Sequence, residues 1–287
     1  MNNENNMMQP ISPHWLMTRR SFLLVSLALL NGCGNGSGGK DSPSRDTGAA
    51  SSGTATVATF DISASAHTEI VKKRYLDGFE QVLAAVHEGD RVEGYPITSI
   101  TQSMSMDRIR AKFPVSKGLL DNPETYKARF AQARRNAVNQ AREVLKLPTA
   151  GSTDILNAFT DAAGILDGCT GMNRHLVVFS DMVHQSSDYD FTREDLTPSR
   201  TKVIIQAQRK AGLLPSLAGV KVWVAGAGAN PTDPNGDPSD AALASQRFVL
   251  PPGKIAQIRN FWISFFDACG ADLSSDRYSA TLQNYPG

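Results

Sequence analysis

The chain has 287 residues, of which 41% are hydrophobic and 20% are charged, so it can bury a sizeable core. Its formal net charge is +1 at pH 7. This balance excludes the strongly basic class of protein that binds nucleic acid through its phosphates, and we predict no nucleic-acid partner.

The N-terminal segment has the composition of an export signal. Arg19 and Arg20 precede a short apolar stretch, 22–30, and the sequence Leu-Asn-Gly-Cys ends at Cys33. Because a membrane-spanning helix needs about twenty apolar residues, we interpret 1–32 as a signal peptide outside the fold. The Leu-x-Gly-Cys ending resembles a bacterial lipoprotein signal, which implies a lipid on Cys33, and the paired arginines resemble a twin-arginine signal. The alternative for Cys33 is a free thiol in a flexible tail.

The remaining chain divides into a tether and one domain. Residues 33–54 are rich in Gly, Ser, Asp and Thr and cannot build a core, so we expect a flexible tether there. Residues 55–287 form the predicted domain. Removal of 1–32 leaves 27 basic and 27 acidic residues. We therefore expect a neutral domain in the cell envelope, lipid-anchored to a bacterial membrane on its periplasmic or extracellular side.

Strand and helix patterns alternate along this domain. In chain order we expect a strand at 56–60, a helix at 68–87, a weak strand at 91–100, helices at 123–146 and 155–166, a strand at 175–179, a helix at 200–212, a strand at 220–225, a helix at 255–268, and a weak strand or extended tail at 278–282. Such alternation implies parallel strands between helices, so the predicted fold class is α/β, with three layers and a doubly wound, mostly parallel sheet. Ligands bind beyond the carboxyl ends of such strands.

Polar side chains follow two of the predicted strands and precede one helix. Asp61, Ser63 and Ser65 come after the first strand, Thr153 lies in a Gly-Ser-Thr-Asp loop, and Asp181 comes after the strand at 175–179. If the two strands are neighbours, these five side chains converge at one edge of the sheet.

This combination resembles the von Willebrand factor A domain with its metal-ion-dependent adhesion site. The family's pattern is Asp-x-Ser-x-Ser, then a threonine in a Gly-rich loop, then an aspartate after the next core strand. The resemblance covers roughly 55–270 and implies a Rossmann-like fold, with Ser63, Ser65 and Thr153 as direct ligands and Asp61 and Asp181 as direct or water-mediated ligands. The chain departs from the family at 101–147, where a long basic helical stretch leaves the edge of the sheet undefined.

The donor set indicates the kind of metal. Hydroxyl and carboxylate oxygens suit Mg²⁺, or Mn²⁺ or Ca²⁺, and no sulfur or imidazole is present to favour zinc. Hydroxyl ligands bring no charge, so the cation stays electrophilic toward an Asp or Glu carboxylate of a protein partner. The alternative is that Ser63, Ser65 and Thr153 only cap helices.

Three functions remain open at this point. The first is a binding module that captures a protein partner through the cation, and the second is a structural scaffold of an envelope or secretion assembly. The third is a metal-dependent hydrolase, since Ser63, His67, Asp181 and His184 fall near the same site. The chain has no Gly-x-Ser-x-Gly, His-Glu-x-x-His or phosphate-loop motif, so we do not predict an enzyme.

Two further features lie outside this site. Export into an oxidising compartment predicts a disulfide between Cys169 and Cys269, and the alternative is two separate buried thiols. The helix at 123–146 carries six basic residues, Lys127, Arg129, Arg134, Arg135, Arg142 and Lys146. They form either a docking face for an acidic protein or anionic headgroups, or an ordinary solvated helix face.

Overall fold

The structure is a computed structural model that describes residues 53–98, except Ser65 and His67, together with 108–118, 121–228 and 250–286. The predicted signal peptide, Cys33 and nearly all of the predicted tether lie outside the described residues. Gly48–Gly287 forms one compact unit. Every buried residue of both hydrophobic clusters lies between Ala55 and Leu282, so this unit contains the whole described core.

The unit is built from a sheet and flanking helices. In chain order the elements are β1 (Thr54–Asp61), α1 (Glu69–Ala84), β2 (Arg91–Ile97), β3 (Ile109–Lys112), α2 (Pro123–Leu145), α3 (Ile155–Asp167), β4 (Asn173–Phe179), α4 (Pro198–Ala211), β5 (Val220–Ala225), α6 (Pro252–Ala268), the 3-10 helix η3 (Ser275–Arg277) and β6 (Tyr278–Ser279). The strand order in the sheet is β3-β2-β1-β4-β5-β6. All neighbours run parallel except β3, which is antiparallel to β2.

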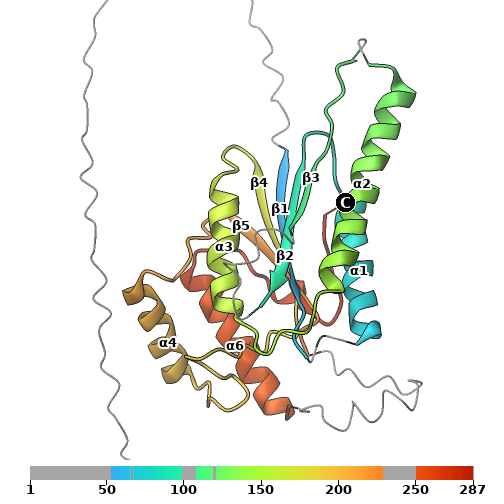
Figure 1. The fold of residues 1–287 in the computed structure, drawn as a ribbon. Helices are drawn as coiled ribbons and strands as arrows, with labels where there is room; N and C mark the ends of the chain where they lie inside the picture. The colour runs from blue at the N-terminus through green and yellow to red at the C-terminus, as the bar shows by residue number, and fades with distance from the viewer. Residues whose placement is uncertain are drawn as a thin grey trace, which may run out of the picture. The chain divides into compact units, whose positions relative to one another are not determined.

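This topology confirms the predicted α/β class with a doubly wound, mostly parallel sheet. In Figure 1, α1 and α2 cover one face of the sheet, and α3, α4 and α6 cover the other. The chain leaves the central strand β1 in one direction to form β2 and β3, and returns to its other side to form β4, β5 and β6. The switch in direction lies between β1 and β4, and such folds bind ligands beyond the carboxyl ends of the strands at this position.

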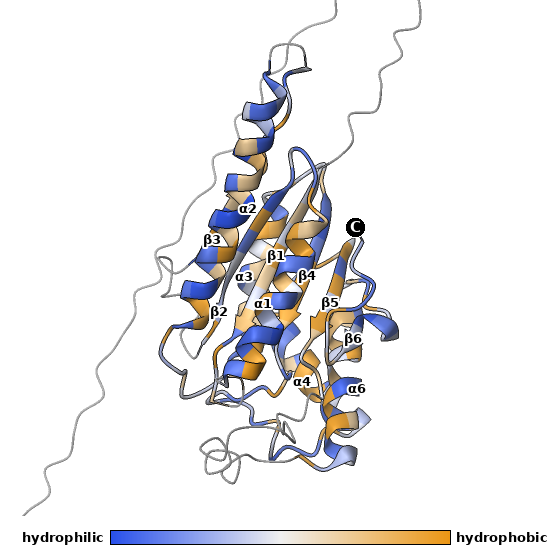
Figure 2. Cartoon of the chain, turned by 90° about the vertical axis from the view of Figure 1, so that its right-hand side faces the viewer, coloured by the Kyte–Doolittle hydropathy of each residue, from blue (hydrophilic) through white to orange (hydrophobic). Residues whose placement is uncertain are grey.

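Side chains alternate between the two faces along each strand, because successive residues of a strand point to opposite sides. In β1, Val57 packs on the side of α3 and α6, whereas Ala58 and Phe60 pack on the side of α1. Phe60 stacks on Phe179 of β4, with ring centroids 5.0 Å apart. Figure 2 shows β5 mostly in the hydrophobic colour, whereas the helices mix hydrophilic and hydrophobic residues along their length. Burial on both faces explains why the central strands read as nearly continuous apolar runs.

Three predictions about the elements need correction. The strand β3 was not predicted, because four residues that alternate apolar and basic side chains at the edge of a sheet carry a weak signal. This strand forms the sheet edge that the sequence left undefined. The predicted strand at 91–100 ends at Ile97, and its last two residues lie outside the described part of the chain. Of the final segment at 278–282, predicted as a weak strand or an extended tail, only Tyr278–Ser279 forms a strand. Of the helices that the structure describes, none is both long enough and apolar enough to cross a membrane.

Candidate metal centre

Asp61 ends β1 and is held from two sides. Its side chain is 1% exposed. One carboxylate oxygen, Oδ1, accepts a hydrogen bond of 2.9 Å from the backbone N–H of Ser63. The other, Oδ2, accepts one of 2.7 Å from the hydroxyl of Ser180, which follows β4. Because β1 and β4 are parallel neighbours, residues 119 positions apart in the sequence meet here.

The loop after β4 places Asp181 beside this carboxylate. The Asp181 side chain accepts a 2.9 Å hydrogen bond from the backbone N–H of Val183. Met182 has a φ of 67°, a left-handed conformation that is uncommon for a residue with a side chain. Met182 is held by two hydrogen bonds. Its backbone N–H donates to the hydroxyl of Ser180 at 2.9 Å, and its carbonyl accepts from the indole N–H of Trp262 at 2.8 Å. The surrounding structure therefore maintains a strained backbone next to the candidate ligand.

The loop that carries Thr153 is bonded to both other segments. Ala150 pairs with Ser63, and its N–H donates to the carbonyl of Ile62 at 3.1 Å. Thr153 pairs with Gln185, with N–H to O distances of 2.8 and 2.9 Å. The structure thus brings Asp61, Ser63, Thr153 and Asp181 to the carboxyl edge between β1 and β4, on three loops that are bonded to one another. The fifth predicted ligand, Ser65, lies outside the described residues.

Neither described hydroxyl residue of the predicted site caps a helix. The N-caps of the two nearest helices are Thr68 for α1 and Asp154 for α3. The capping alternative is therefore wrong for Ser63 and Thr153, which are 7% and 2% exposed. Both sit in the loops that line the strand ends.

The electrostatics of the site are those of two acidic groups close together. Burial is the largest cause that raises the pKa of Asp61 to about 7, and the negative charge of Asp181 is the second. Hydrogen bonds from Ser63 and Ser180 oppose this rise. Burial, followed by the charges of Asp61 and Asp181, also raises the pKa of Tyr75. None of the groups that shift the pKa of Asp61 within the described chain is basic.

The residues of this site fit a divalent cation in their charge and in their donor atoms. At this strand edge the charge of Asp181 and burial together raise the pKa of Asp61, and a positive charge placed between the loops compensates such a pair of carboxylates. The donors are oxygens, which hard cations prefer. Across the described residues, no group of three or more His, Cys, Asp or Glu side chains is placed to hold a metal ion, so a cation at this site would depend on hydroxyl oxygens as well as on the two carboxylates.

His184 is a structural residue of the same loop. Its side chain is fully buried, and its Nδ1 accepts a 3.2 Å hydrogen bond from the N–H of Ile155 at the start of α3. Its Nε2 lies 3.0 Å from the hydroxyl of Ser186. Burial lowers the pKa of His184 to about 4, so the ring is neutral near pH 7. With both ring nitrogens engaged, His184 anchors α3 to the loop after β4. The other histidine near the site, His67, lies outside the described residues.

Ser180 is the residue of the candidate site whose supporting role the sequence analysis missed. It is fully buried and braces Asp61 and Met182 at the same time. The available signal was a hydroxyl residue at the end of a buried strand, directly before the candidate Asp181. That signal becomes decisive only when β4 is known to lie beside β1.

The two cysteines of the domain are not joined. Cys169 and Cys269 are both buried free thiols. The Sγ of Cys169 lies 3.5 Å from the carbonyl of Ile165 and 3.6 Å from a guanidinium nitrogen of Arg91. Burial raises the pKa of Cys269 to about 12. The predicted disulfide is therefore replaced by its alternative, two separate buried thiols.

No protein family model matches the chain, and no curated protein matches it. Among solved structures, the chain is similar to the conserved hypothetical protein BatB from Bacteroides thetaiotaomicron, with 13% identity, a TM-score of 0.40, and coverage of 81% of this chain and 92% of that one. It is also similar to a von Willebrand factor type A structure from Catenulispora acidiphila, with 12% identity, a TM-score of 0.37, and coverage of 77% of this chain and 43% of that one. An aerotolerance-related membrane protein from Bacteroides fragilis NCTC 9343 matches with 13% identity, a TM-score of 0.37, and coverage of 81% and 92%. Likeness at this level establishes neither a family nor an activity.

Proposed function

We propose that the domain is a lipid-anchored, extracytoplasmic von Willebrand factor A-like module that binds a protein partner through a divalent cation. The single observation that carries this proposal is the meeting of Asp61 and Asp181 at the switch point between β1 and β4, where the charge of Asp181 adds to burial in raising the pKa of Asp61. The loops of Ser63 and Thr153 close around the same edge. The membrane anchor rests on the lipoprotein-like sequence at Cys33.

The residues of the site divide into ligands and supports. Ser63, Ser65 and Thr153 are the proposed hydroxyl ligands, and Asp61 and Asp181 balance the charge of Mg²⁺, or of Mn²⁺ or Ca²⁺, directly or through water. When bound, the cation supplies a Lewis-acidic position that a carboxylate of the partner can fill. Ser180 and the N–H of Ser63 orient the carboxylate of Asp61 before any cation arrives.

Thermal unfolding tests the cation site. The chain from Gly48 to Gly287 is melted in Mg²⁺, in Mn²⁺ and in chelator, beside Asp61→Ala. A cation at 100 times its dissociation constant adds about 2.7 kcal/mol to the free energy of unfolding. For a domain of this size, that gain raises the melting midpoint by about 5–10 °C. Asp188→Ala is the matched control, because Asp188 is an exposed carboxylate on the loop after β4, and it should keep the full response. Equal midpoints in cation and chelator would refute the site.

Partner capture separates the module from the alternatives. The full chain is used to capture proteins from the native envelope in Mg²⁺ and in chelator, beside Asp181→Ala. A partner that is lost in chelator and in Asp181→Ala, while the variant stays folded, supports binding through the cation. Partners retained in both conditions indicate a scaffold instead. Cation-dependent turnover of ester or phosphate substrates would indicate a hydrolase, a reading that the engaged ring nitrogens of His184 disfavour.

A further inference from the structure

The charges of the domain cancel overall but are separated within it. β3, α2 and the residues that adjoin them, 108–146, include ten basic and three acidic residues. The other residues of 55–287 include 15 basic and 22 acidic residues. Because β3 is an edge strand and α2 packs beside it, the excess of positive charge lies at one edge of the fold. The metal centre belongs to the acidic remainder.

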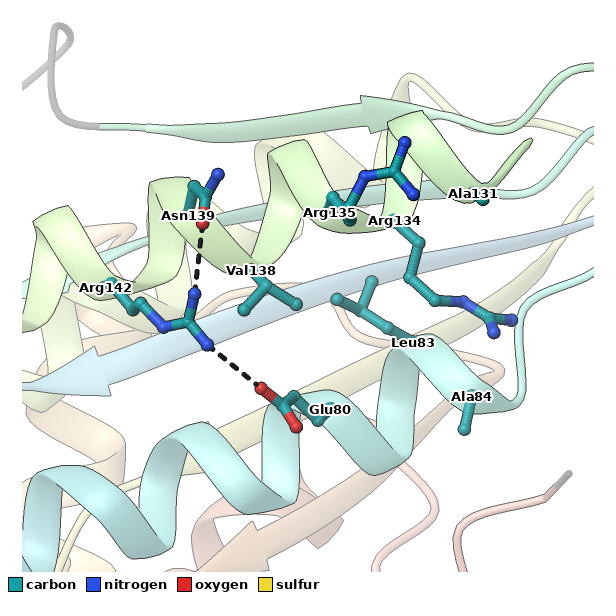
Figure 3. A pocket seen from close by; sticks show the side chains of 9 residues that line it. All are labelled: Glu80, Leu83, Ala84, Ala131, Arg134, Arg135, Val138, Asn139 and Arg142. Atoms are coloured by element: carbon teal, nitrogen blue, oxygen red, sulfur yellow. Dashed lines mark hydrogen bonds and ion pairs between the residues drawn. The ribbon is translucent and has the colours of Figure 1, made fainter. Parts of the chain in front are cut away.

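Part of this basic segment projects beyond the sheet. In Figure 1, residues 113–118 and the first turns of α2 extend past the start of β1. The last turn of α1, at Ala84, lines one groove together with Ala131 and Arg135 of α2 (Figure 3), so the turns of α2 before Ala131 continue beyond the end of α1. We call residues 113–135 the basic projection, because they include five basic and two acidic residues.

Lys117 and Arg135 are the open positive charges of the basic projection. Two other basic residues pair with its two carboxylates, Arg129 with Asp121 at 2.8 Å and Lys127 with Glu124 at 3.2 Å. Arg134 lies over the ring of Phe130, on the side of α1. Lys117 and Arg135 are exposed and form no ion pair with any described residue, and Figure 3 shows Arg135 directed away from α1. Both can therefore meet an external anion.

The loop of the basic projection lies where the chain enters the sheet. The N–H of Thr54, the first residue of β1, donates to Asp90 at 2.6 Å, and the N–H of Ser116 donates to Glu88 at 3.1 Å. The turn that carries Glu88 and Asp90 therefore binds both segments. Val115, beside Ser116, is 60% exposed, more than any other large hydrophobic residue of the described chain. An exposed apolar side chain among basic ones suits the headgroup layer of an anionic membrane, which accommodates both.

We propose that the basic projection docks on the anionic surface of the membrane that holds the domain, with Lys117 and Arg135 at the lipid headgroups and Val115 inserted among them. The proposal rests on the lipid anchor at Cys33 in the proposed function. The predicted tether, 33–54, spans about 25 Å as a flexible chain, so it keeps this end of the domain near the bilayer. An acidic protein would match the charge, but it would explain neither the exposed Val115 nor the position beside the tether.

Docking by this end sets the direction of the metal centre. Asp61 and Thr54 are the last and first of the eight residues of β1, which places them about 23 Å apart along the strand. Charges more than about 8 Å from the headgroups are largely screened at physiological salt, so the acidic metal edge does not oppose docking. The cation then faces away from the bilayer, where a protein partner can reach it.

Co-sedimentation of the chain from Gly48 to Gly287 with vesicles tests the docking. At physiological salt and in chelator, phosphatidylcholine vesicles with one third phosphatidylglycerol should retain the protein, and pure phosphatidylcholine vesicles should not. One basic residue at such a surface strengthens binding about fivefold, so Lys117→Gln with Arg135→Gln should weaken it about 25-fold. Lys202→Gln with Lys210→Gln is the matched control, because it removes two exposed charges from α4, and it should leave binding unchanged.

The proposal fails if anionic vesicles do not retain the protein, if neutral vesicles retain it equally, or if both double variants lose binding equally. Val115→Ser should also weaken binding without lowering the melting midpoint, because the side chain is exposed, and unchanged binding would overturn the proposal. Immobilised polyglutamate is the probe for an acidic protein, and stronger retention there than on the vesicles would overturn the proposal as well. These measurements need neither a cation nor the lipid on Cys33, so their failure and the failure of the metal centre are distinguishable.

A fluorescent label reports the orientation. A polarity-sensitive fluorophore on Val115→Cys should shift to the blue in anionic vesicles, whereas the same label on Asp188→Cys, in the exposed part of the loop after β4, should not. The native Cys169 and Cys269 are buried and should not take the label. A shift at both positions, or at neither, would overturn the proposal.

Discussion

Gly226→Ala is the substitution that most directly tests how the sheet supports the metal centre. Gly226 follows β5 with a φ of 115°, which residues with a side chain rarely adopt. A Cβ atom there would lie 2.7 Å from the carbonyl oxygen of Ser180 and 3.0 Å from a ring carbon of Tyr75. Since the hydroxyl of Ser180 braces Asp61, any shift of the Ser180 backbone also moves the candidate ligand.

The expected magnitude follows from two contributions. A residue forced into a sparsely populated backbone region costs about 1–3 kcal/mol. Weakening the hydrogen bond between Ser180 and the Asp61 carboxylate costs about 1.5–3 kcal/mol, because one partner is charged. Part of the second cost is avoided if Ser180 moves only slightly, so we expect a total loss of about 3 kcal/mol. For a domain of this size, that loss lowers the melting midpoint by about 6–12 °C.

Urea denaturation of the chain from Gly48 to Gly287, in Mg²⁺ and in chelator, provides the assay. Gly171→Ala is the matched control, because Gly171 also has a positive φ, 78°, but its added Cβ would meet nothing within 4 Å. The control should lose only about 1–2 kcal/mol, the cost of a left-handed backbone, and keep its Mg²⁺ response. If Gly226→Ala loses no more than Gly171→Ala and responds equally to Mg²⁺, the link from β5 through Ser180 to Asp61 is wrong.

Three further outcomes are expected. Ser180→Ala removes the hydroxyl that donates to Asp61, so the free energy of unfolding measured in urea should fall by about 1–3 kcal/mol. The stabilisation by Mg²⁺ should fall in part as well. If neither quantity changes, the hydroxyl does not support Asp61. In the folded protein the pKa of His184 is about 4, so the ring is neutral near pH 7. As the pH falls below 6.5, the unfolded chain takes up a proton on this histidine before the folded chain does. The stability that neutral His184 contributes is therefore present above pH 6.5 and is lost as the pH falls toward 4. The stability deficit of His184→Gln relative to wild type should therefore shrink by about 2 kcal/mol between pH 7 and pH 5, and a deficit independent of pH would contradict the buried neutral ring. Cys169 and Cys269 should react with a thiol reagent only after denaturation, and a reductant should leave the midpoint unchanged; a midpoint that falls on reduction would reveal a disulfide.

Much of the fold was readable from local pattern. The helices at 123–146 and 155–166 were predicted to within one residue at each end, because proline, asparagine and aspartate mark their starts. The buried strands β1, β4 and β5 were found because residues covered on both faces form apolar runs. The edge strand β3 escaped prediction because only one short antiparallel pairing with β2 defines it.

The candidate site was readable only in part. Asp61, Ser63, Thr153 and Asp181 were named from their positions after strands and before a helix. The bonds that hold them were not, since Ser180 meets Asp61 across 119 residues and Thr153 pairs with Gln185 across a loop. The disulfide prediction was wrong because it rested on the oxidising compartment alone. A disulfide also requires the two cysteines to lie close together in the fold, and Cys169 and Cys269 are free thiols.

The sequence by itself determined the order of strands and helices and the supply of oxygen donors at the strand ends, because both depend on short-range periodicity. The tertiary structure decided that β1 lies beside β4 and that Ser180 braces Asp61. These features depend on contacts between segments far apart in the chain, and local preferences of the backbone do not specify them.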